Sequence, residues 1–169
     1  FSYLAVTLAL ASASFLVSSC GKDDSTLVPT KTYANVMVVH ASPNAPAVDL
    51  LVDNSKVNTT GLGYSNNTGY LNVESGTRNI TVNPTGTLTS VINADLNFIK
   101  NMSYTIFAID SVSKIAPLLL TDDLTMPAAG KAHVRFVHLS PNAPAVDVAV
   151  ASSGAVVFGN KKFKESTAY

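Results

Sequence analysis

From residue 21 onward, short apolar runs alternate with short polar breaks, and this pattern predicts strands. The runs are rich in Val, Ile, Thr, Tyr and Phe, as strands are, and Gly, Asn, Pro, Ser and Asp punctuate them, as in turns. No window of eleven or more residues in this part of the chain shows helical spacing of apolar positions. The predicted strands are residues 34–41, 47–53, 69–74, 77–83, 88–93, 102–109 and 114–120.

Strands of this length and spacing predict an all-β sandwich. No connection between them is long enough for a crossover helix, so we expect the strands to be antiparallel. Tyr104 follows a Lys-Asn turn, and its hydroxyl is expected to bond to backbone just upstream, as in the tyrosine corner of sandwich folds.

Part of the sequence is repeated. Residues 34–52 recur at 132–150, and 13 of these 19 positions are identical at an offset of 98. We therefore predict one complete sandwich unit over 33–126 and a second unit over 131–169 that is truncated at its C-terminal side. Pro127 and Gly130 mark the joint between them.

The N-terminal part reads as a secretion signal. Residues 3–17 are apolar and uncharged, too short to span a bilayer as a helix but as long as the core of a signal peptide. Residue 1 is Phe and no basic stretch precedes the apolar core, so we expect the sequence to begin inside a signal peptide that ends at residue 19.

Cys20, the one cysteine of the chain, directly follows Leu16-Val17-Ser18-Ser19. An aliphatic residue, two small residues and Cys resemble a bacterial lipobox, in which the thiol takes a diacylglyceryl group and the new amino terminus takes a fatty acid such as palmitate. Two or more acyl chains make such an anchor durable. The prediction is a lipidated Cys20 on a flexible tether over 20–32. The alternative is a plain secretory signal with an incidental cysteine.

The residues after Cys20 suggest where the protein resides. Gly21-Lys22-Asp23-Asp24 lacks an Asp directly after the cysteine and resembles the surface-export signal of lipoproteins in one large phylum of Gram-negative bacteria. We therefore expect a protein anchored in the outer membrane by its lipid and facing the cell exterior. The alternative is a solvated tether whose charges carry no signal.

The composition of the chain argues against several kinds of partner and cofactor. Hydrophobic residues make up 47% and charged residues 13% of the chain, with 11 basic and 11 acidic residues. Zero net charge argues against a nucleic-acid partner. One cysteine excludes a disulfide framework within the chain, and three histidines leave little material for a metal centre. We predict no cofactor and no metal.

The repeated string is His-x-Ser-Pro-Asn-Ala-Pro-Ala-Val-Asp. It occurs at 40–49, the first motif copy, and at 138–147, the second motif copy. It resembles the hallmark of the domain of unknown function family 4397, found in bacterial secreted and surface proteins and often in tandem. The resemblance implies an immunoglobulin-like or transthyretin-like sandwich and no established activity.

The motif itself predicts a structural corner. Pro43 and Pro46 remove two backbone donors and end the strand near Ser42. Asn44 is suited to an Asx turn, and His40 and Asp49 are expected to bond to the turn backbone or to each other. The same structural role is predicted for His40, Ser42, Pro43, Asn44, Pro46, Asp49, His138, Ser140, Pro141, Asn142, Pro144 and Asp147.

Other interpretations of these residues remain open. His40, Ser42 and Asp49 are the residue types of a hydrolytic triad, but the serine precedes a proline in a turn without a strained elbow. Acidic and amide oxygens suit Ca²⁺, yet their spacing matches no known loop. His133 and His138 lack a third partner for zinc. The oxygen candidates are Asp49, Asp53, Asn54, Asp122 and Asp123, and the candidate tyrosines for stacking on a sugar are Tyr33, Tyr64, Tyr70 and Tyr104.

The sequence thus predicts a non-enzymatic cell-surface lipoprotein of tandem β-sandwich domains, acting as a stalk, spacer or binding module. Its partners are the membrane, through the lipid, and an extracellular glycan or protein. One alternative is a dedicated glycan- or protein-binding module. A less favoured one is a hydrolase using the His/Ser/Asp motif; no catalytic residue is assigned.

Overall fold

A computed structural model describes residues 30–169, so the predicted signal peptide, Cys20 and most of the predicted tether lie outside the described residues. Within the described part, residues 31–169 form one compact unit built almost wholly of strands. None of its helical turns is long and apolar enough to cross a membrane. The elements are β1 (Tyr33–His40), β2 (Val48–Val52), β3 (Ser55–Lys56), β4 (Asn67–Glu74), β5 (Gly76–Pro84), β6 (Ile92–Phe98), β7 (Ser103–Ile109), the 3-10 turn η1 (Val112–Lys114), β8 (Ala116–Asp122), β9 (Val146–Ala149) and β10 (Val156–Lys161).

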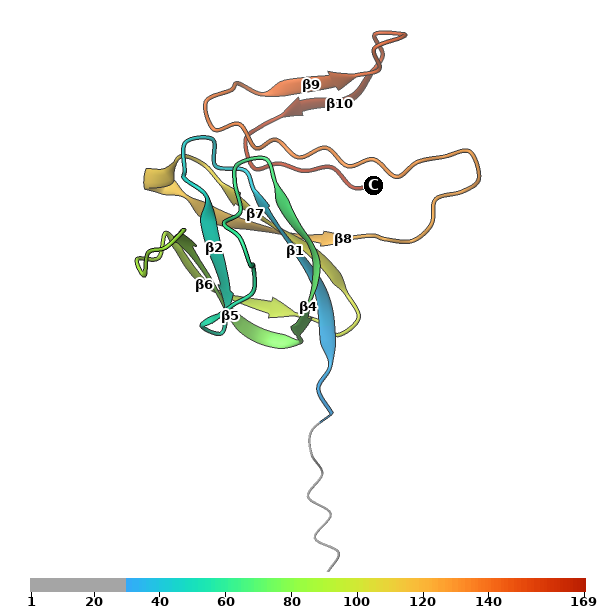
Figure 1. Cartoon of the computed structure of the whole chain (residues 1–169). Coiled ribbons are helices and arrows are strands. Elements are labelled where there is room, and N and C mark those ends of the chain that lie inside the picture. Colours follow the sequence, from blue (N-terminus) through green and yellow to red (C-terminus); the bar gives the residue numbers. More distant parts are fainter. Residues whose placement is uncertain (1–29) are drawn as a thin grey trace, which may run out of the picture. The chain divides into compact units, whose positions relative to one another are not determined.

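Two four-stranded sheets form a sandwich, which confirms the predicted all-β fold class (Figure 1). The first sheet has the order β4-β1-β7-β8 and the second sheet the order β3-β2-β5-β6. All neighbouring strands are antiparallel except β1 and β7, which are parallel. Between β1 and β7 the chain crosses to the second sheet and back twice, so no helix is needed for this crossover. The prediction of antiparallel strands is therefore wrong for this pair, because β1 and β7 are neighbours in the sheet but not in the sequence.

Six of the seven predicted strands agree with the structure within two residues at each end. The prediction of a strand at 88–93 is wrong, because β6 runs from Ile92 to Phe98. Leu88 is 98% exposed in the loop that precedes β6. The two-residue strand β3 was not predicted either; it follows a tight turn at Asp53 and Asn54, both of which have positive φ.

The core lies between the two sheets. Its largest fully buried side chains include Phe98, Leu50, Ile80 and Ile106, contributed by both sheets. The hydroxyl oxygen of Tyr104 accepts a hydrogen bond from the backbone N–H of residue 99 at 3.2 Å, five residues upstream. This is the predicted tyrosine corner, and it fixes the β6–β7 connection against the core.

The first sheet is also covered on its other side. In β1, Val36 and Val38 point into the core, whereas Met37 and Val39 point outward and are still half-buried. We call this side the outer face; its residues around a cavity of about 460 Å³ are Met37, Val39, Tyr70, Thr105, Phe107 and Asp122. Across the cavity lie residues of the C-terminal segment, 131–169: Arg135, Phe136, Val137, Leu139 and Tyr169.

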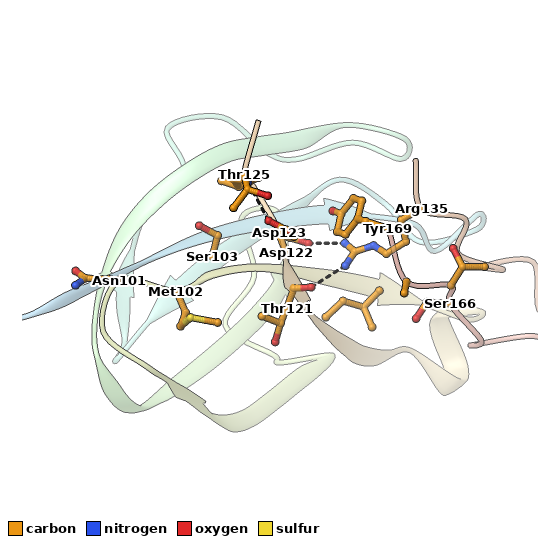
Figure 2. A pocket seen from close by; sticks show the side chains of 14 residues that line it. Asn101, Met102, Ser103, Thr121, Asp122, Asp123, Thr125, Arg135, Ser166 and Tyr169 are labelled. Atoms are coloured by element: carbon orange, nitrogen blue, oxygen red, sulfur yellow. Dashed lines mark hydrogen bonds and ion pairs between the residues drawn. The ribbon is translucent and has the colours of Figure 1, made fainter. Parts of the chain in front are cut away.

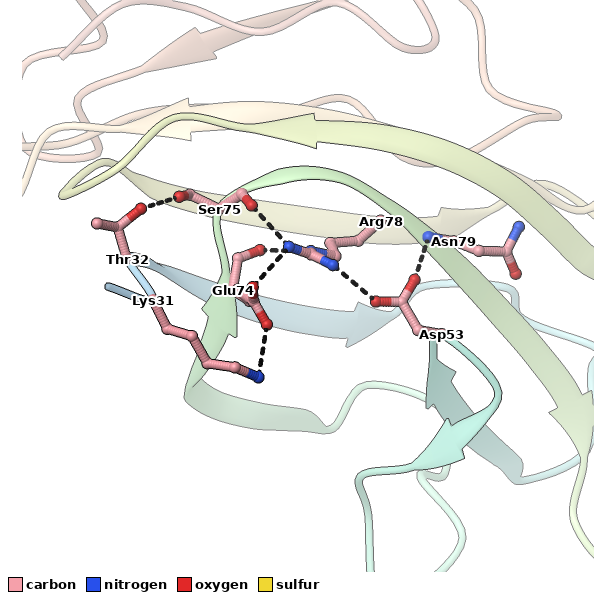
Figure 3. A network of polar contacts seen from close by, with 7 residues as sticks. All are labelled: Lys31, Thr32, Asp53, Glu74, Ser75, Arg78 and Asn79. Atoms are coloured by element: carbon pink, nitrogen blue, oxygen red, sulfur yellow. Dashed lines mark hydrogen bonds and ion pairs between the residues drawn. The ribbon is translucent and has the colours of Figure 1, made fainter. Parts of the chain in front are cut away.

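A charged network holds the start of β1 against the turn between β4 and β5 (Figure 3). Lys31 bonds to Glu74 at 3.1 Å, and Arg78 bonds to Glu74 at 3.2 Å and to Asp53 at 3.3 Å. Gly76 adopts φ +99° in this turn, a conformation that side chains disfavour. The network therefore fixes the point at which the chain enters the sandwich.

Candidate functional site

Both motif copies form the same corner. The imidazole Nε2 of His40, at the buried end of β1, donates to the carbonyl oxygen of Pro46 at 3.0 Å. In the second motif copy, Nε2 of His138 donates to the carbonyl oxygen of Pro144 at 3.2 Å. A proline turn offers few backbone donors, so the histidine supplies the donor that this carbonyl lacks. His40 is fully buried.

The structure does not join His40, Ser42 and Asp49 into a triad. The Ser42 hydroxyl is buried and has no hydrogen-bond partner, so it makes no bond to His40. Asp49 instead forms an ion pair with Lys56 at 2.9 Å and accepts a hydrogen bond from the backbone N–H of Gly86 at 3.2 Å. The Lys56 ammonium and the Gly86 amide lower the pKa of the Asp49 carboxyl. Asp49 therefore ties β2 to β3 and to the β5–β6 turn.

The remaining motif residues also bond within the protein. Asn44 does not make the expected Asx turn, because its side-chain oxygen accepts from the N–H of Val112 at 2.9 Å. This bond ties the corner to the turn before β8. In the second motif copy, the Asp147 carboxylate accepts from the N–H of Asn160 at 2.6 Å and joins β9 to β10. The turn residues Pro43, Pro141 and Asn142 lie at or near the surface.

Four of the five side chains considered for Ca²⁺, Asp49, Asp53, Asp122 and Asp123, have protein partners. Asp53 pairs with Arg78 and accepts from the N–H of Asn79, and Asp123 accepts from the N–H of Thr125. The side chain of Thr125 and, to a lesser extent, its backbone N–H lower the pKa of Asp123. No group of three or more His, Cys, Asp or Glu side chains with the geometry of a metal site occurs among residues 30–169.

The tyrosines considered for stacking have separate contacts. Tyr33 begins β1, Tyr104 forms the corner described above, and Tyr64 lies edge-on to the His40 ring with centroids 6.2 Å apart. Tyr70 lies on the outer face and donates to the Asp122 carboxylate at 2.9 Å. Tyr64, Tyr70 and Tyr104 therefore have three different neighbours.

Sequence reasoning missed the most developed polar cluster, which is centred on Asp122 at the end of β8 (Figure 2). One carboxylate oxygen accepts from Tyr70 at 2.9 Å and from the Thr105 hydroxyl at 2.6 Å. The other pairs with Arg135, whose guanidinium also donates to the carbonyl of Thr121 at 2.8 Å. The side chain of Asp122 is 1% exposed and that of Arg135 is 11% exposed.

This cluster joins the sandwich to the C-terminal segment. The Arg135 guanidinium lies over the ring of Tyr169, 4.7 Å from its centroid. Burial and the bond to Asp122 raise the pKa of Tyr70 to about 12. Removing one partner of a buried ion pair lowers the stability of a protein by about 3–5 kcal/mol. The cluster, which we call the Asp122 clamp, therefore fixes the C-terminal segment on the outer face.

A cavity of about 880 Å³ adjoins the clamp. Its wall includes Asn101, Ser103 and Asp123 from the sandwich and Ser166 and Tyr169 from the C-terminal segment (Figure 2). The lining combines hydroxyl, amide and carboxylate groups with an aromatic ring. Such a lining offers hydrogen bonds and a stacking surface to a polar ligand.

Fold and site together define a β-sandwich protein whose buried polar side chains mostly bind its own chain. The chain belongs to the family described as domain of unknown function DUF4397, which matches residues 34–149. The match covers the sandwich from the second residue of β1 onward and includes both motif copies. No curated protein matches the chain.

Proposed function

We propose that this protein is a non-enzymatic lipoprotein of the bacterial cell surface, in which sandwich units serve as a stalk, spacer or binding module. The lipobox-like sequence at Cys20 and the charged residues after it support an outer-membrane anchor that faces outward. The polar stretch up to residue 32 separates this anchor from β1.

The main support for a structural role is that buried polar groups bond to other parts of the same chain. His40 and His138 bond to turn carbonyls, Asp49 to a turn amide, and Asp122 to its own sheet and to Arg135. Groups that bind a substrate or catalyse a reaction need free donors, acceptors or lone pairs directed at a ligand. Here the bonds that these groups make stabilise corners and joints, as a spacer requires. The Nδ1 of His40 and the hydroxyl of Ser42 have no hydrogen-bond partner, but both side chains are fully buried.

Hydrogen bonds support a second unit that starts like the first. The N–H of Val38 donates to the Thr68 hydroxyl and that of Phe136 to the Thr167 hydroxyl, both at 3.0 Å. We therefore propose that 131–169 is the beginning of another sandwich repeat, and that consecutive repeats are joined by clamps such as that at Asp122.

Labelling and fractionation test the anchor. In a Gram-negative host, the wild-type chain should incorporate radioactive palmitate, sediment with the outer membrane and be degraded by protease added to intact cells. Cys20→Ser should remove the label and release the protein from the membrane, and Ser19→Ala, which keeps a small residue, should leave both unchanged. Label that persists in Cys20→Ser, or protection of the wild type from external protease, would contradict the proposal.

The cavity beside the Asp122 clamp favours a binding module as the second candidate. A glycan array and a surface-protein capture assay on the purified chain test it, with Asn101→Ala as the variant expected to weaken a ligand in this cavity. Lys100→Ala, one residue away and outside the cavity lining, is the matched control. The hydrolase alternative predicts an activity that Ser42→Ala abolishes, whereas the spacer predicts none.

A further inference from the structure

The end of the sandwich at which β1 begins carries exposed apolar side chains. Tyr33, the first residue of β1, is 45% exposed, and Ile99 and Met102, in the turn between β6 and β7, are 60% and 39% exposed. The backbone N–H of Asn101 donates to the carbonyl of Tyr33, and that of Asn35 donates to the carbonyl of Met102, both at 2.9 Å. These two bonds hold the turn beside the start of β1, so the three apolar side chains lie at one end of the sandwich.

Two lysines accompany these apolar side chains. Lys100 is exposed in the same turn and forms no ion pair within residues 30–169. Lys31 bonds to Glu74 at 3.1 Å but keeps most of its side chain exposed (Figure 3). Tyrosine rings and lysine chains are suited to a bilayer interface, because each has an apolar body for the acyl region and a polar tip for the headgroups. We call this surface the entry patch; it consists of Lys31, Tyr33, Ile99, Lys100 and Met102.

The opposite end of the sandwich has a different surface. Gly76, at the start of β5, pairs with Phe98, which directly precedes Ile99. β5 is nine residues long and β6 returns antiparallel to it, so the loop between them lies about 30 Å from the entry patch. Leu88 in this loop is almost fully exposed but is flanked by two threonines instead of lysines or further apolar residues. Leu88 therefore provides an exposed apolar position for comparison.

The entry patch lies where the chain from the predicted lipid anchor joins the sandwich. Only ten residues, 21–30, separate Cys20 from Lys31. A fully extended chain spans at most about 3.5 Å per residue, so Lys31 stays within about 40 Å of Cys20 whatever conformation these residues adopt. A tether of this length gives the patch an effective concentration on the order of millimolar at the membrane. A surface that binds lipid only weakly on its own is then sufficient.

We propose that the entry patch docks on the phospholipid bilayer that holds the lipid anchor. Ile99, Met102 and Tyr33 lie at the boundary of the acyl chains, and the two lysines of the patch contact anionic headgroups. The proposal rests on the lipid anchor proposed above. Docking gives the first sandwich a fixed direction, in which its strands lead away from the membrane and the loop at Leu88 is remote from it. The base of a stalk requires such a direction.

Tryptophan substitution tests the docking, because the chain contains no tryptophan. The chain from Cys20 onward keeps the compact unit of residues 31–169 and is coupled through its one thiol to a maleimide lipid in vesicles. The vesicles contain phosphatidylglycerol and brominated phosphatidylcholine, which quenches tryptophan in the acyl region. Ile99→Trp emission should shift to shorter wavelength and be quenched. Leu88→Trp, at the opposite end, should emit as it does in the uncoupled protein.

Charge reversal distinguishes docking from the proximity that any tether produces. A lysine near an anionic surface strengthens binding about fivefold. In the Ile99→Trp chain, Lys100→Glu should therefore lower the ratio of docked to undocked protein at least about fivefold, and the quenching should also weaken on vesicles without phosphatidylglycerol. Lys114→Glu makes the same charge change in η1, beyond the far end of β7, and is the matched control. It should leave the quenching unchanged, because physiological salt screens charges beyond about 8 Å.

The coupled lipid separates this test from that of the anchor in cells. If palmitate labelling fails but Ile99→Trp is quenched, the natural anchor is wrong and the docking surface stands. If labelling succeeds but Ile99→Trp emits as in the uncoupled protein, the docking is overturned and the anchor stands. Equal quenching of Ile99→Trp and Leu88→Trp also overturns the docking, because the sandwich then has no preferred end. Tyr33→Trp, an aromatic replacement in the same patch, serves as the probe if circular dichroism shows that Ile99→Trp does not fold.

Discussion

Replacement of His40 by Ala tests whether the motif corner is structural. His40 is fully buried, and its Nε2 is the hydrogen-bond partner of the Pro46 carbonyl. The substitution leaves that carbonyl without its donor, at a cost of about 1–3 kcal/mol. It also removes a ring from a closed site at the edge of the core, and ring-to-alanine changes in cores cost about 3–5 kcal/mol. Because an imidazole is smaller than a phenyl ring, we expect a total loss of about 4 kcal/mol, at the low end of the two contributions together.

The second motif copy supplies a matched control. His138 makes the same bond to Pro144 and is 3% exposed, but it lies in the C-terminal segment rather than in the sandwich. His138→Ala should therefore loosen that segment and lower the free energy of unfolding of the sandwich by less than about 1 kcal/mol. His40→Gln, which retains an N–H donor near the position of Nε2, should recover part of the loss.

Urea denaturation followed by far-UV circular dichroism measures these differences. His40→Ala should lower the midpoint with little change in the m-value, because the surface exposed on unfolding stays the same. Equal losses in His40→Ala and His138→Ala would show that the corner does not depend on the sandwich around it. Wild-type stability in His40→Ala would refute the structural role altogether.

Three further outcomes follow from the structure. The pKa of Tyr70 is raised to about 12 from an ordinary 10.0. In an absorbance titration at high pH, this tyrosine should ionise at a pH about two units above the usual value, and Tyr70→Phe should remove that part of the titration curve. The pKa of Asp49 is lowered in the folded state, so its stabilising contribution is present above its unfolded pKa of 3.8 and is lost as the pH falls through the lowered value. Asp49→Asn should therefore reduce the loss of stability that the protein shows when the pH is lowered. Phe98→Ala should cost about 3–5 kcal/mol in chemical denaturation, whereas Ile99→Ala, at a side chain that is 60% exposed, should cost less than about 0.5 kcal/mol; similar costs would place the core elsewhere.

The strand pattern was recoverable from the sequence wherever apolar runs coincide with strands. The predicted strand at 88–93 contains β-branched residues, but its apolar and polar positions do not alternate. Residues 92–98 read Ile-Asn-Ala-Asp-Leu-Asn-Phe, a strict alternation of apolar and polar positions, and in the structure the apolar ones face the core. Period two is the direct physical consequence of a strand with one buried face, and residue type is only a correlate.

The motif was predictable in part. A histidine before a proline turn implies a donor to the turn backbone, and this bond forms in both copies. The partners of Asp49 and Asn44 were not predictable, because both bond to segments brought close only by the fold: Gly86 in the β5–β6 turn and Val112 in the 3-10 turn. Bonds within a turn follow from the local sequence, whereas bonds between turns depend on the sheet order.

The partners in the Asp122 clamp also depend on the fold, because they come from segments far apart in the sequence. Two features of the sequence nevertheless point to the clamp. Strands buried on both faces show continuous apolar runs, as Met37-Val38-Val39 and Leu118-Leu119-Leu120 do. These runs in a two-sheet sandwich imply that something covers the outside of the first sheet. Within the repeat, an arginine where the first copy has an apolar residue implies a buried partner for its charge, because an unpaired buried guanidinium is too costly to keep. Together these two signals indicate that a segment with a buried arginine covers the outer face. Only the structure shows that its carboxylate partner is Asp122.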